Sequence, residues 1–162
     1  MNATFVGLRC FSTKSFSHLD SKGDVKMVDV SEKFDTSRVA TAKGYIEMLP
    51  STLDLISSHQ ISKGNVLATA KIAGIMAAKQ TSNLVPLCHP LQISQVDLEF
   101  ECDEKNSRIH VSATVKCVGK TGVEMEALIS VSVACCTIYD MCKAVDKGMI
   151  ISNIYVSEKK GL

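Results

Sequence analysis

An acid and an amine stand three residues apart in the stretch Tyr139-Asp140-Met141-Cys142-Lys143, late in an apolar run. If that run is a helix, Asp140 and Lys143 share one helix face. Such a pair is costly in apolar surroundings unless it is exposed or used. The pair is therefore a candidate for moving protons on a substrate. The alternative interpretation is an ordinary surface ion pair.

A second basic position, Lys63, precedes Gly64 at the start of a long helical pattern that also contains Lys71 and Lys79. The amino end of a helix with a lysine beside it binds phosphate, because free N–H groups and the helix dipole point at the anion. This motif predicts a phosphate-bearing ligand. The alternative is a solvated helix face.

The loop Leu87-Cys88-His89-Pro90 lies between regular elements, with Pro86 just before it. A histidine between two prolines is held stiffly, because each proline fixes its own backbone torsion angle. His89 is therefore a candidate for contact with substrate. The alternative is a histidine that simply lies on the surface of a loop.

The segment GKTGVEME (119–126) places Glu124, Met125 and Glu126 where a helix begins. It is not a Walker phosphate loop, because the upstream glycine of that motif is missing. The two glutamates are candidate ligand-binding groups. The alternative is that acids in the first turn complement the helix dipole.

The spacing of these motifs carries a geometric consequence. If residues 126–143 form one helix, Glu126 and Asp140 lie about 21 Å apart, at about 1.5 Å per residue. One small substrate cannot bridge both ends of that helix within a single chain. If both clusters are functional, we expect a composite site that is built across a subunit interface.

The composition excludes several classes of protein. The chain has 162 residues, which is one domain plus a short extension, and its formal net charge is +1. A protein that binds nucleic acid through many phosphates is strongly basic, and single-strand binders use aromatic platforms. Aromatic residues make up only 5% of this chain and tryptophan is absent. We expect no nucleic-acid partner, and no stretch has the roughly 18 uninterrupted apolar residues of a membrane span.

The seven cysteines include no C-x-x-C pair. Their odd number and their position in apolar runs predict small buried side chains in a reducing compartment, and neither a disulfide framework nor a structural zinc site. Residues 1–19 are basic, rich in Ser and Thr and free of acids. That pattern is typical of an organellar transit peptide, and the alternative is a frayed terminus. We therefore assign 1–26 to a targeting segment and linker, and 27–162 to the functional domain.

The remaining pattern predicts the elements that position these residues. A strand is expected over 37–48, a helix over 51–58 after Pro50, and a long Ala-rich helix over 64–81. Alternating residues then predict a hairpin of strands that turns at 103–107. An apolar helix over 123–145, stopped by Gly148, and a strand over 149–156 complete the order. The order predicts an α+β fold, a ferredoxin-like antiparallel sheet with helices packed on one face, in which the uncovered face or the sheet edges would need a partner.

Five segments together resemble one known family, the cyclic pyranopterin monophosphate synthases. They are MVDVSEK (27–33), KGNVLATAKIAGIMAAKQT (63–81), LVPLCHPL (84–91), GKTGVEMEAL (119–128) and CTIYDMCKAV (136–145). Their order and spacing make the resemblance highly specific, and it covers the chain from about Met27 to Tyr155. Asn65 departs from the family, which often has Asp at this position.

The resemblance implies a lyase of molybdenum cofactor (molybdopterin) biosynthesis. Its substrate would be (8S)-3′,8-cyclo-7,8-dihydroguanosine 5′-triphosphate, and its products cyclic pyranopterin monophosphate and diphosphate. It implies three catalytic residues and seven that bind substrate. The catalytic residues are Asp140, Lys143 and Lys63, and the substrate-binding residues are Leu87, Cys88, His89, Met125, Glu126, Glu124 and Lys79. We expect Lys63 and Lys143 to have depressed pKa values and to act as acid and base.

The resemblance also implies an assembly and a setting. It implies a homohexamer, a trimer of dimers with active sites at the dimer interfaces, and a functional link to a radical iron–sulfur GTP cyclase. No cofactor or metal ligand is expected, and magnesium on the phosphates is left open. The targeting segment favours the mitochondrial matrix, and the alternative location is the cytoplasm.

Overall fold

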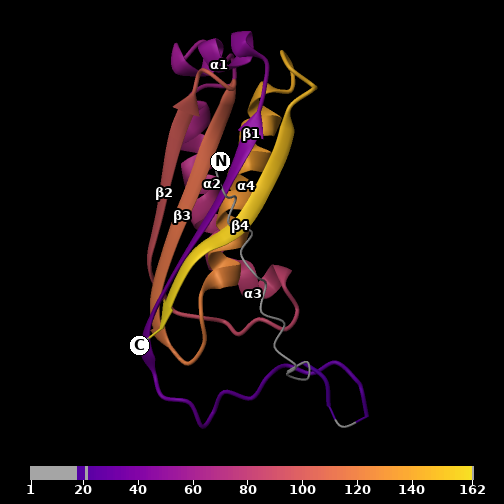
Figure 1. Cartoon of the computed structure of the whole chain (residues 1–162), viewed down its shortest axis with the longest axis vertical. Helices are drawn as coiled ribbons and strands as arrows, with labels where there is room; N and C mark the ends of the chain where they lie inside the picture. The colour runs from indigo at the N-terminus through magenta and orange to yellow at the C-terminus, as the bar shows by residue number, and fades with distance from the viewer. Residues whose placement is uncertain (1–17, 21, 162) are drawn as a thin grey trace, which may run out of the picture.

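The computed structural model describes residues 18–20 and 22–161 (Figure 1). The predicted order of strands and helices is confirmed, with one extra short helix, α3. The elements along the chain are β1 (Thr36–Glu47), α1 (Pro50–Ser57), α2 (Val66–Lys79), α3 (Thr81–Leu84), β2 (Ile93–Asp103), β3 (Arg108–Gly119), α4 (Glu124–Cys142) and β4 (Ile150–Gly161).

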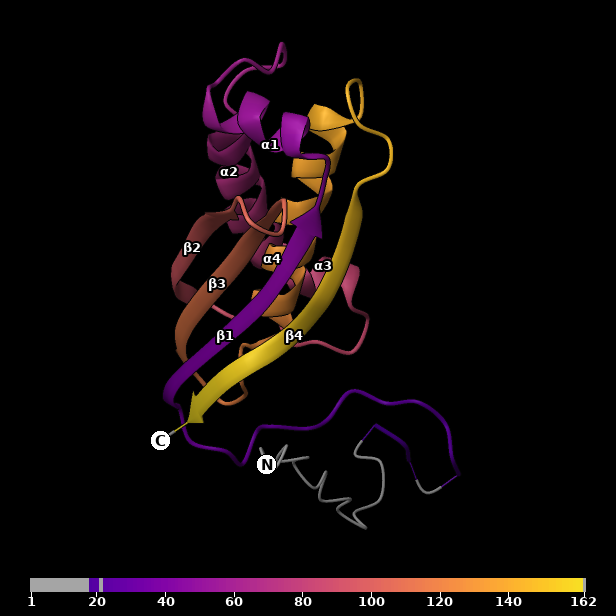
Figure 2. The same cartoon turned by 45° about the horizontal axis from the view of Figure 1, so that its top comes forward.

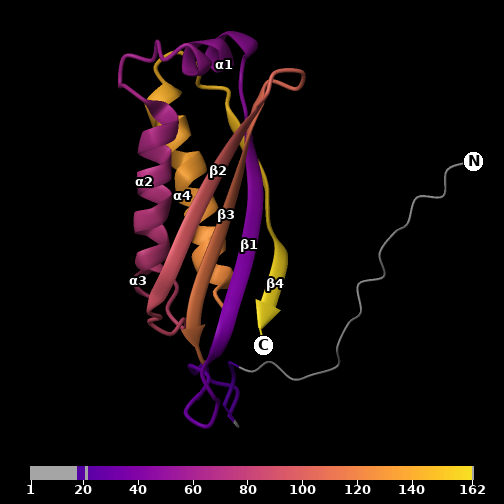
Figure 3. The same ribbon diagram turned by 90° about the vertical axis from the view of Figure 1, so that its left-hand side faces the viewer.

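The four strands form one antiparallel sheet in the order β2-β3-β1-β4. Seen from the edge, α2 and α4 cover one face of this sheet and the other face is open (Figure 3). The predicted fold class, a ferredoxin-like α+β fold with helices on one face, is confirmed. The two central strands, β3 and β1, carry the core, because every second residue of β3 from Ile109 to Cys117 is buried.

The helices pack closely because small residues line their contacts. Asn65 caps α2, since its side-chain oxygen accepts a hydrogen bond from the backbone N–H of Ala68. Gly74 of α2 lies against Ser130 of α4, and a Cβ atom at Gly74 would stand 3.0 Å from the Ser130 carbonyl oxygen. Lys63, just before α2, contacts Asp140 near the end of α4. The two helices therefore run antiparallel.

Two predicted helix boundaries are wrong. The helix expected over 64–81 divides at Gln80, which ends α2 and precedes α3. The helix expected to run to residue 145 ends at Cys142, with Lys143 as its C-cap. Gly148 is not the stop signal, because the Cys142 carbonyl accepts hydrogen bonds from Val145 and Asp146 and so closes the turn earlier.

Among the described residues, α4 alone is long and apolar enough to cross a membrane by length and composition, and half of that stretch is buried inside the fold. It packs against α2 and against β1, β3 and β4, and a core helix of a soluble fold has the same composition. Cys117, Cys135 and Cys142 are buried as small core residues, whereas Cys102 and Cys136 are exposed.

The segment before β1 extends beyond the lower end of the sheet (Figure 2). Leu19 and Val25 form an isolated antiparallel bridge, and residues 26–35 contain no helix or strand. Most of the predicted targeting segment, residues 1–17 and 21, lies outside the described residues.

Candidate active site

Two lysines from distant parts of the chain meet one carboxylate at the carboxyl end of α4. Lys143 Nζ lies 2.7 Å from Asp140 Oδ1, and Lys63 Nζ lies 3.0 Å from Asp140 Oδ2. Lys63 also donates to the Asp140 backbone carbonyl at 2.7 Å. The three predicted catalytic residues therefore form one cluster. All three are partly exposed, so a ligand can reach them.

The helix end explains why cations gather here. The last carbonyl groups of a helix have no partner within it, and the helix dipole places negative charge at that end. Lys143 follows α4 directly as its C-cap, and Lys63 reaches the same end from the loop between α1 and α2. The cluster thus depends on the positions of the loop after α1, which contains Lys63, and of the turn after α4, which contains Lys143.

The charges in this cluster stabilise one another. Hydrogen bonds from Lys143 and Lys63, together with their charges, lower the pKa of Asp140. The hydrogen bond to Asp140 and its negative charge raise the pKa of Lys143. The prediction of a depressed pKa for Lys143 is therefore wrong, because the adjacent carboxylate favours the ammonium form. Asp140 is held as a carboxylate, which suits it to orient the lysines.

The second cluster surrounds a cavity of about 450 Å³ at the opposite end of α4. The predicted substrate-binding residues that line it are Leu87, Cys88, His89, Glu124, Met125 and Glu126. The loop after α3 supplies the first three and the first turn of α4 supplies the others. The structure thus brings together two motifs that are more than thirty residues apart in the sequence.

One of the two glutamates that line this cavity, Glu126, is buried, which is uncommon for a carboxyl group. Glu126 is only 4% exposed, and this burial raises the pKa of its carboxyl group. Burial and the charge of Glu126 also raise the pKa of the nearby Cys88 thiol. Cys88 is therefore held as a neutral thiol, which makes it a poor nucleophile. Glu126 is the polar group of the cavity that is best placed to bind a donor on a ligand.

Glu124 lies at the edge of this cavity and pairs with the end of β4. Lys159 Nζ lies 3.2 Å from Glu124 Oε1. The Glu124 carboxylate folds back over Gly122, and a Cβ atom at that position would overlap it. Gly122 thus permits the conformation of Glu124, and Lys159 joins the cavity edge to the last strand.

The segment before β1 also contributes to the cavity, which the sequence motifs did not predict. Val28, Val30 and Lys33 also line the cavity. Lys120 holds this segment in place by donating to the Ser31 carbonyl at 2.9 Å. The signal was present in MVDVSEK (27–33), which contributes to the family resemblance but offers no obvious catalytic group.

The two clusters remain apart in a single chain. Glu126 and Asp140 both belong to α4, and fourteen residues of helix separate them by about 21 Å. Lys79 ends α2, and the antiparallel packing of the helices places it toward the cavity end, although it is not among the lining residues. Lys71 instead pairs with Asp97 at 3.8 Å.

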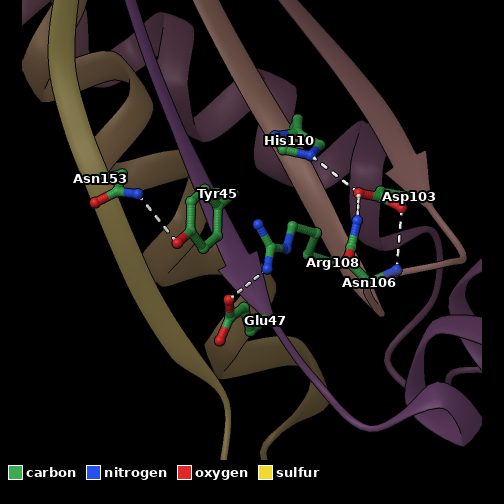
Figure 4. A network of polar contacts seen from close by, with 7 residues as sticks. All are labelled: Tyr45, Glu47, Asp103, Asn106, Arg108, His110 and Asn153. Atoms are coloured by element: carbon green, nitrogen blue, oxygen red, sulfur yellow. Dashed lines mark hydrogen bonds and ion pairs between the residues drawn. The ribbon is translucent and has the colours of Figure 1, made fainter. Parts of the chain in front are cut away.

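The open face of the sheet carries a third polar cluster (Figure 4). The Arg108 guanidinium lies 4.4 Å from the centre of the Tyr45 ring and 2.9 Å from Glu47 Oε1. The other side chains of this cluster are Asp103, Asn106, His110 and Asn153. Polar side chains that contact one another thus occupy one end of the open face of the sheet. It borders a shallow cavity of about 860 Å³.

No group of three or more His, Cys, Asp or Glu side chains in the described ranges, 18–20 and 22–161, is arranged to hold a metal ion. The polar groups of both clusters at the ends of α4 include lysine amines, imidazoles and carboxylates. Such groups bind and protonate an organic anion directly.

Comparison with known proteins gives a consistent result. The sequence model of the MoaC family matches residues 27–161. A relative in Parvibaculum lavamentivorans is 55% identical over 150 residues, which are 93% of this chain and 94% of the relative. A relative in Desulfitobacterium hafniense is 58% identical over 145 residues, or 90% and 88% of the two chains. One in Heliobacterium modesticaldum is 56% identical over 145 residues, or 90% and 91%.

Each of these three relatives bears the name cyclic pyranopterin monophosphate synthase. The matched region contains both clusters described above, from the segment at residue 27 to the end of β4. Because the family model covers most of the chain and the relatives are more than half identical over nearly their full length, the chain belongs to the MoaC family.

Proposed function

We propose that this chain is a cyclic pyranopterin monophosphate synthase, a lyase of molybdenum cofactor biosynthesis. It converts (8S)-3′,8-cyclo-7,8-dihydroguanosine 5′-triphosphate to cyclic pyranopterin monophosphate and diphosphate. The observation that carries this proposal is the cluster of Lys63, Asp140 and Lys143, in a chain whose relatives bear that name. Two amines on one carboxylate form a site that can bind phosphates and move protons.

The reaction needs proton transfers, because the imidazole part of the purine opens and a pyran ring closes. Asp140 keeps Lys143 as an ammonium ion and raises its pKa, so this lysine donates a proton only to a strongly basic group that develops during the reaction. Asp140 orients Lys143 and Lys63 through its two oxygens. Attack of a ribose-derived hydroxyl on the α-phosphorus forms the new P–O bond and breaks the bond to the β-phosphate oxygen. The lysine charges stabilise the departing diphosphate.

The cavity at the other end of α4 is the proposed site for the base of the substrate. Glu126 is buried among the cavity residues and can accept hydrogen bonds from the guanine-derived ring. His89, Cys88 and Leu87 form the opposite wall, and Met125 lies beside Glu126. Glu124 and Lys79 are proposed as outer contacts, because Glu124 lines the cavity edge and Lys79 lies toward this end of the helix pair outside the lining.

A substrate that touches both clusters requires a second copy of the chain. Met125, Ile129, Val133, Cys136 and Asp140 recur at helical spacing, so they form one stripe along α4. Each of them is half-buried or exposed in the single chain. A second α4 running antiparallel along this stripe, about a two-fold axis near Val133, brings its Glu126 end to the Asp140 end of the first.

The larger assembly and the setting follow as parts of the proposal. Such dimers would associate into a homohexamer, a trimer of dimers, and a radical iron–sulfur GTP cyclase would supply the unstable substrate. The catalytic domain would comprise residues 27–162, and residues 1–26 would precede it as a separate segment. The relatives reported above are bacterial and favour a cytoplasmic location over the mitochondrial matrix.

A single-turnover assay tests the function. Purified wild-type protein and the Lys143→Ala variant are mixed with the cyclised dihydro-GTP substrate, and product and diphosphate are measured. The wild type should form both in equal amounts and the variant neither. Absence of product from correctly assembled wild-type protein would refute the assigned reaction, and equal turnover by the variant would refute the role of Lys143.

A further inference from the structure

A buried carboxylate outside both clusters, Asp146, lies three residues beyond Lys143. Its side chain is 5% exposed and accepts hydrogen bonds from three donors. These are the backbone N–H of Leu49 at 2.8 Å, the hydroxyl of Thr52 at 3.2 Å and the backbone N–H of Gly148 at 2.9 Å. A buried carboxylate with several donors is fixed firmly in place.

Two of these donors belong to the start of α1. The N-cap position of α1 is Leu49, which has no polar side chain to bind the free N–H groups there. Asp146, 97 residues away, instead accepts hydrogen bonds from the N–H of Leu49 itself and from the Thr52 hydroxyl, and so ties the start of α1 to the turn after α4. Its negative charge also complements the amino end of the helix dipole. The position of α1 therefore depends on the turn that follows α4.

The chain that leaves α1 leads directly to Lys63. Its first turn is closed by hydrogen bonds from the backbone N–H groups of His59 and Gln60 to carbonyls of α1. A further bond from the Gly64 N–H to the Ile61 carbonyl shapes the loop that presents Lys63. Because the loop is short, a movement of α1 is passed on to this lysine.

The backbone of Asp146 holds the second lysine. Its N–H donates to the Cys142 carbonyl at 3.1 Å and closes the turn that contains Lys143. The Tyr139 hydroxyl binds the Lys147 carbonyl at 3.2 Å and supports the same turn. One residue thus joins the chain segment of Lys63 to the chain segment of Lys143.

We propose that Asp146 is a positioning residue for the reaction, because it fixes α1 and the turn after α4 so that both lysines meet Asp140. The inference rests on the proposed function. Lysine side chains are long and mobile, and here they are about half exposed. Their placement on two oxygens of one carboxylate therefore depends on where their backbones are anchored.

The test is Asp146→Asn in the full-length protein, because the amide keeps the shape but turns an N–H group toward one of the donors. We expect kcat to fall about tenfold or more, since displacements near 1 Å cost up to about a hundredfold in a preorganised site. KM should change much less. Asp54→Asn removes the same charge from the exposed side of α1 and is the matched control, with unchanged kcat.

A second measurement does not depend on turnover. The pKa of Lys143, followed by NMR of its labelled side chain, should fall in Asp146→Asn because the amine moves away from Asp140. Thr52→Val removes one donor without changing the volume greatly, and should lower the Lys143 pKa in the same direction but less. If the wild type is inactive, the assigned reaction fails, while this titration still decides the role of Asp146.

The inference is overturned if Asp146→Asn is folded and keeps both the kcat and the Lys143 pKa of the wild type. It is also overturned if kcat falls while the Lys143 pKa stays unchanged, because the loss then reflects general destabilisation. Should Asp146→Asn fail to fold, Thr52→Val alone decides, and an unchanged Lys143 pKa in that variant contradicts the inference.

Discussion

Lys143 Nζ lies 2.7 Å from Asp140 Oδ1, and the two residues occupy the last turn of α4 and the position just after it. This contact leaves the second oxygen of Asp140 free to bind Lys63, which approaches from a different part of the chain. One carboxylate thus sets the distance between two amines. The charges of Lys143 and Asp140 also depend on each other.

The first prediction concerns the charge of Lys143. In Asp140→Asn, the pKa of Lys143 should fall toward its ordinary value, because the hydrogen bond to the carboxylate and its charge raise it in the wild type. Side-chain NMR titration measures this change. The basic limb of the pH–rate profile should move to lower pH in parallel, if residual turnover permits the measurement. A Lys143 pKa equal to that of the wild type would contradict the pairing.

The second prediction concerns the composite site. Glu126→Gln and Lys143→Ala should each be inactive alone, and an unfolded mixture refolded together should regain about a quarter of wild-type activity. The reason is that half of the dimers are mixed, and each mixed dimer has one intact site of two. Each variant refolded alone is the control. A mixture that remains inactive would show that both clusters act within one chain.

The third prediction uses the cysteines as reporters of the α4 stripe. Cys136 and Cys102 are both exposed in the single chain. If α4 packs against its copy, Cys136 becomes protected in the assembly, and a thiol reagent should label Cys102 first. Cys135 is a buried control, since burial raises its pKa to about 12. Labelling is located by mass spectrometry, and equal rates for Cys136 and Cys102 would exclude this interface.

The sequence predicted the fold well because its patterns are local. Strict alternation in β3 requires one buried face, and the Ala-rich run of α2 favours a helix that packs closely on its neighbours. The helix ends were less predictable. Cys142 ends α4 because of hydrogen bonds in the following turn, and Asp146 in that turn has partners near Leu49, far away in the sequence. No local pattern contains such a contact.

In the candidate site, too, the local pairings could be predicted from the sequence and the long-range contacts could not. The pairing of Asp140 with Lys143 follows from their spacing, and the structure adds Lys63 as a third member. The direction of the Lys143 pKa shift was predicted wrongly, because spacing alone does not show that a carboxylate oxygen lies within hydrogen-bonding distance of the amine. The cavity walls from Val28 and Val30 depend on a long-range contact between Lys120 and Ser31.

The fourth prediction concerns the contact between α2 and α4. Gly74→Ala should destabilise the protein by about 1–3 kcal/mol, the usual cost of overpacking. The new Cβ would stand 3.0 Å from the Ser130 carbonyl and 2.6 Å from a methyl group of Leu98. This cost exceeds the gain of up to about 1 kcal/mol from helix propensity. Chemical unfolding measures this loss of stability. In a Leu98→Ala background, Gly74→Ala should cost less, because the closer of the two clashes is gone.

The fifth prediction concerns Glu126 and pH. Burial raises the pKa of this carboxyl group in the folded chain above its value in the unfolded chain. Its contribution to stability is therefore complete below the unfolded pKa and is lost as pH rises through the folded pKa. Glu126→Gln, which cannot ionise, should accordingly be more stable than the wild type at pH 7.

The advantage of Glu126→Gln should disappear at about pH 3, well below the unfolded pKa of about 4.3, where the wild-type carboxyl group is protonated in both states. Urea unfolding of both proteins at the two pH values measures the difference in the free energy of unfolding. Glu124→Gln is the matched control, since that carboxylate is paired with Lys159 at the cavity edge and gains no stability from losing its charge. An equal difference between wild type and Glu126→Gln at both pH values would contradict a burial-shifted carboxyl group. A difference in stability that does not depend on pH would come from the contacts of the introduced amide and not from ionisation of Glu126.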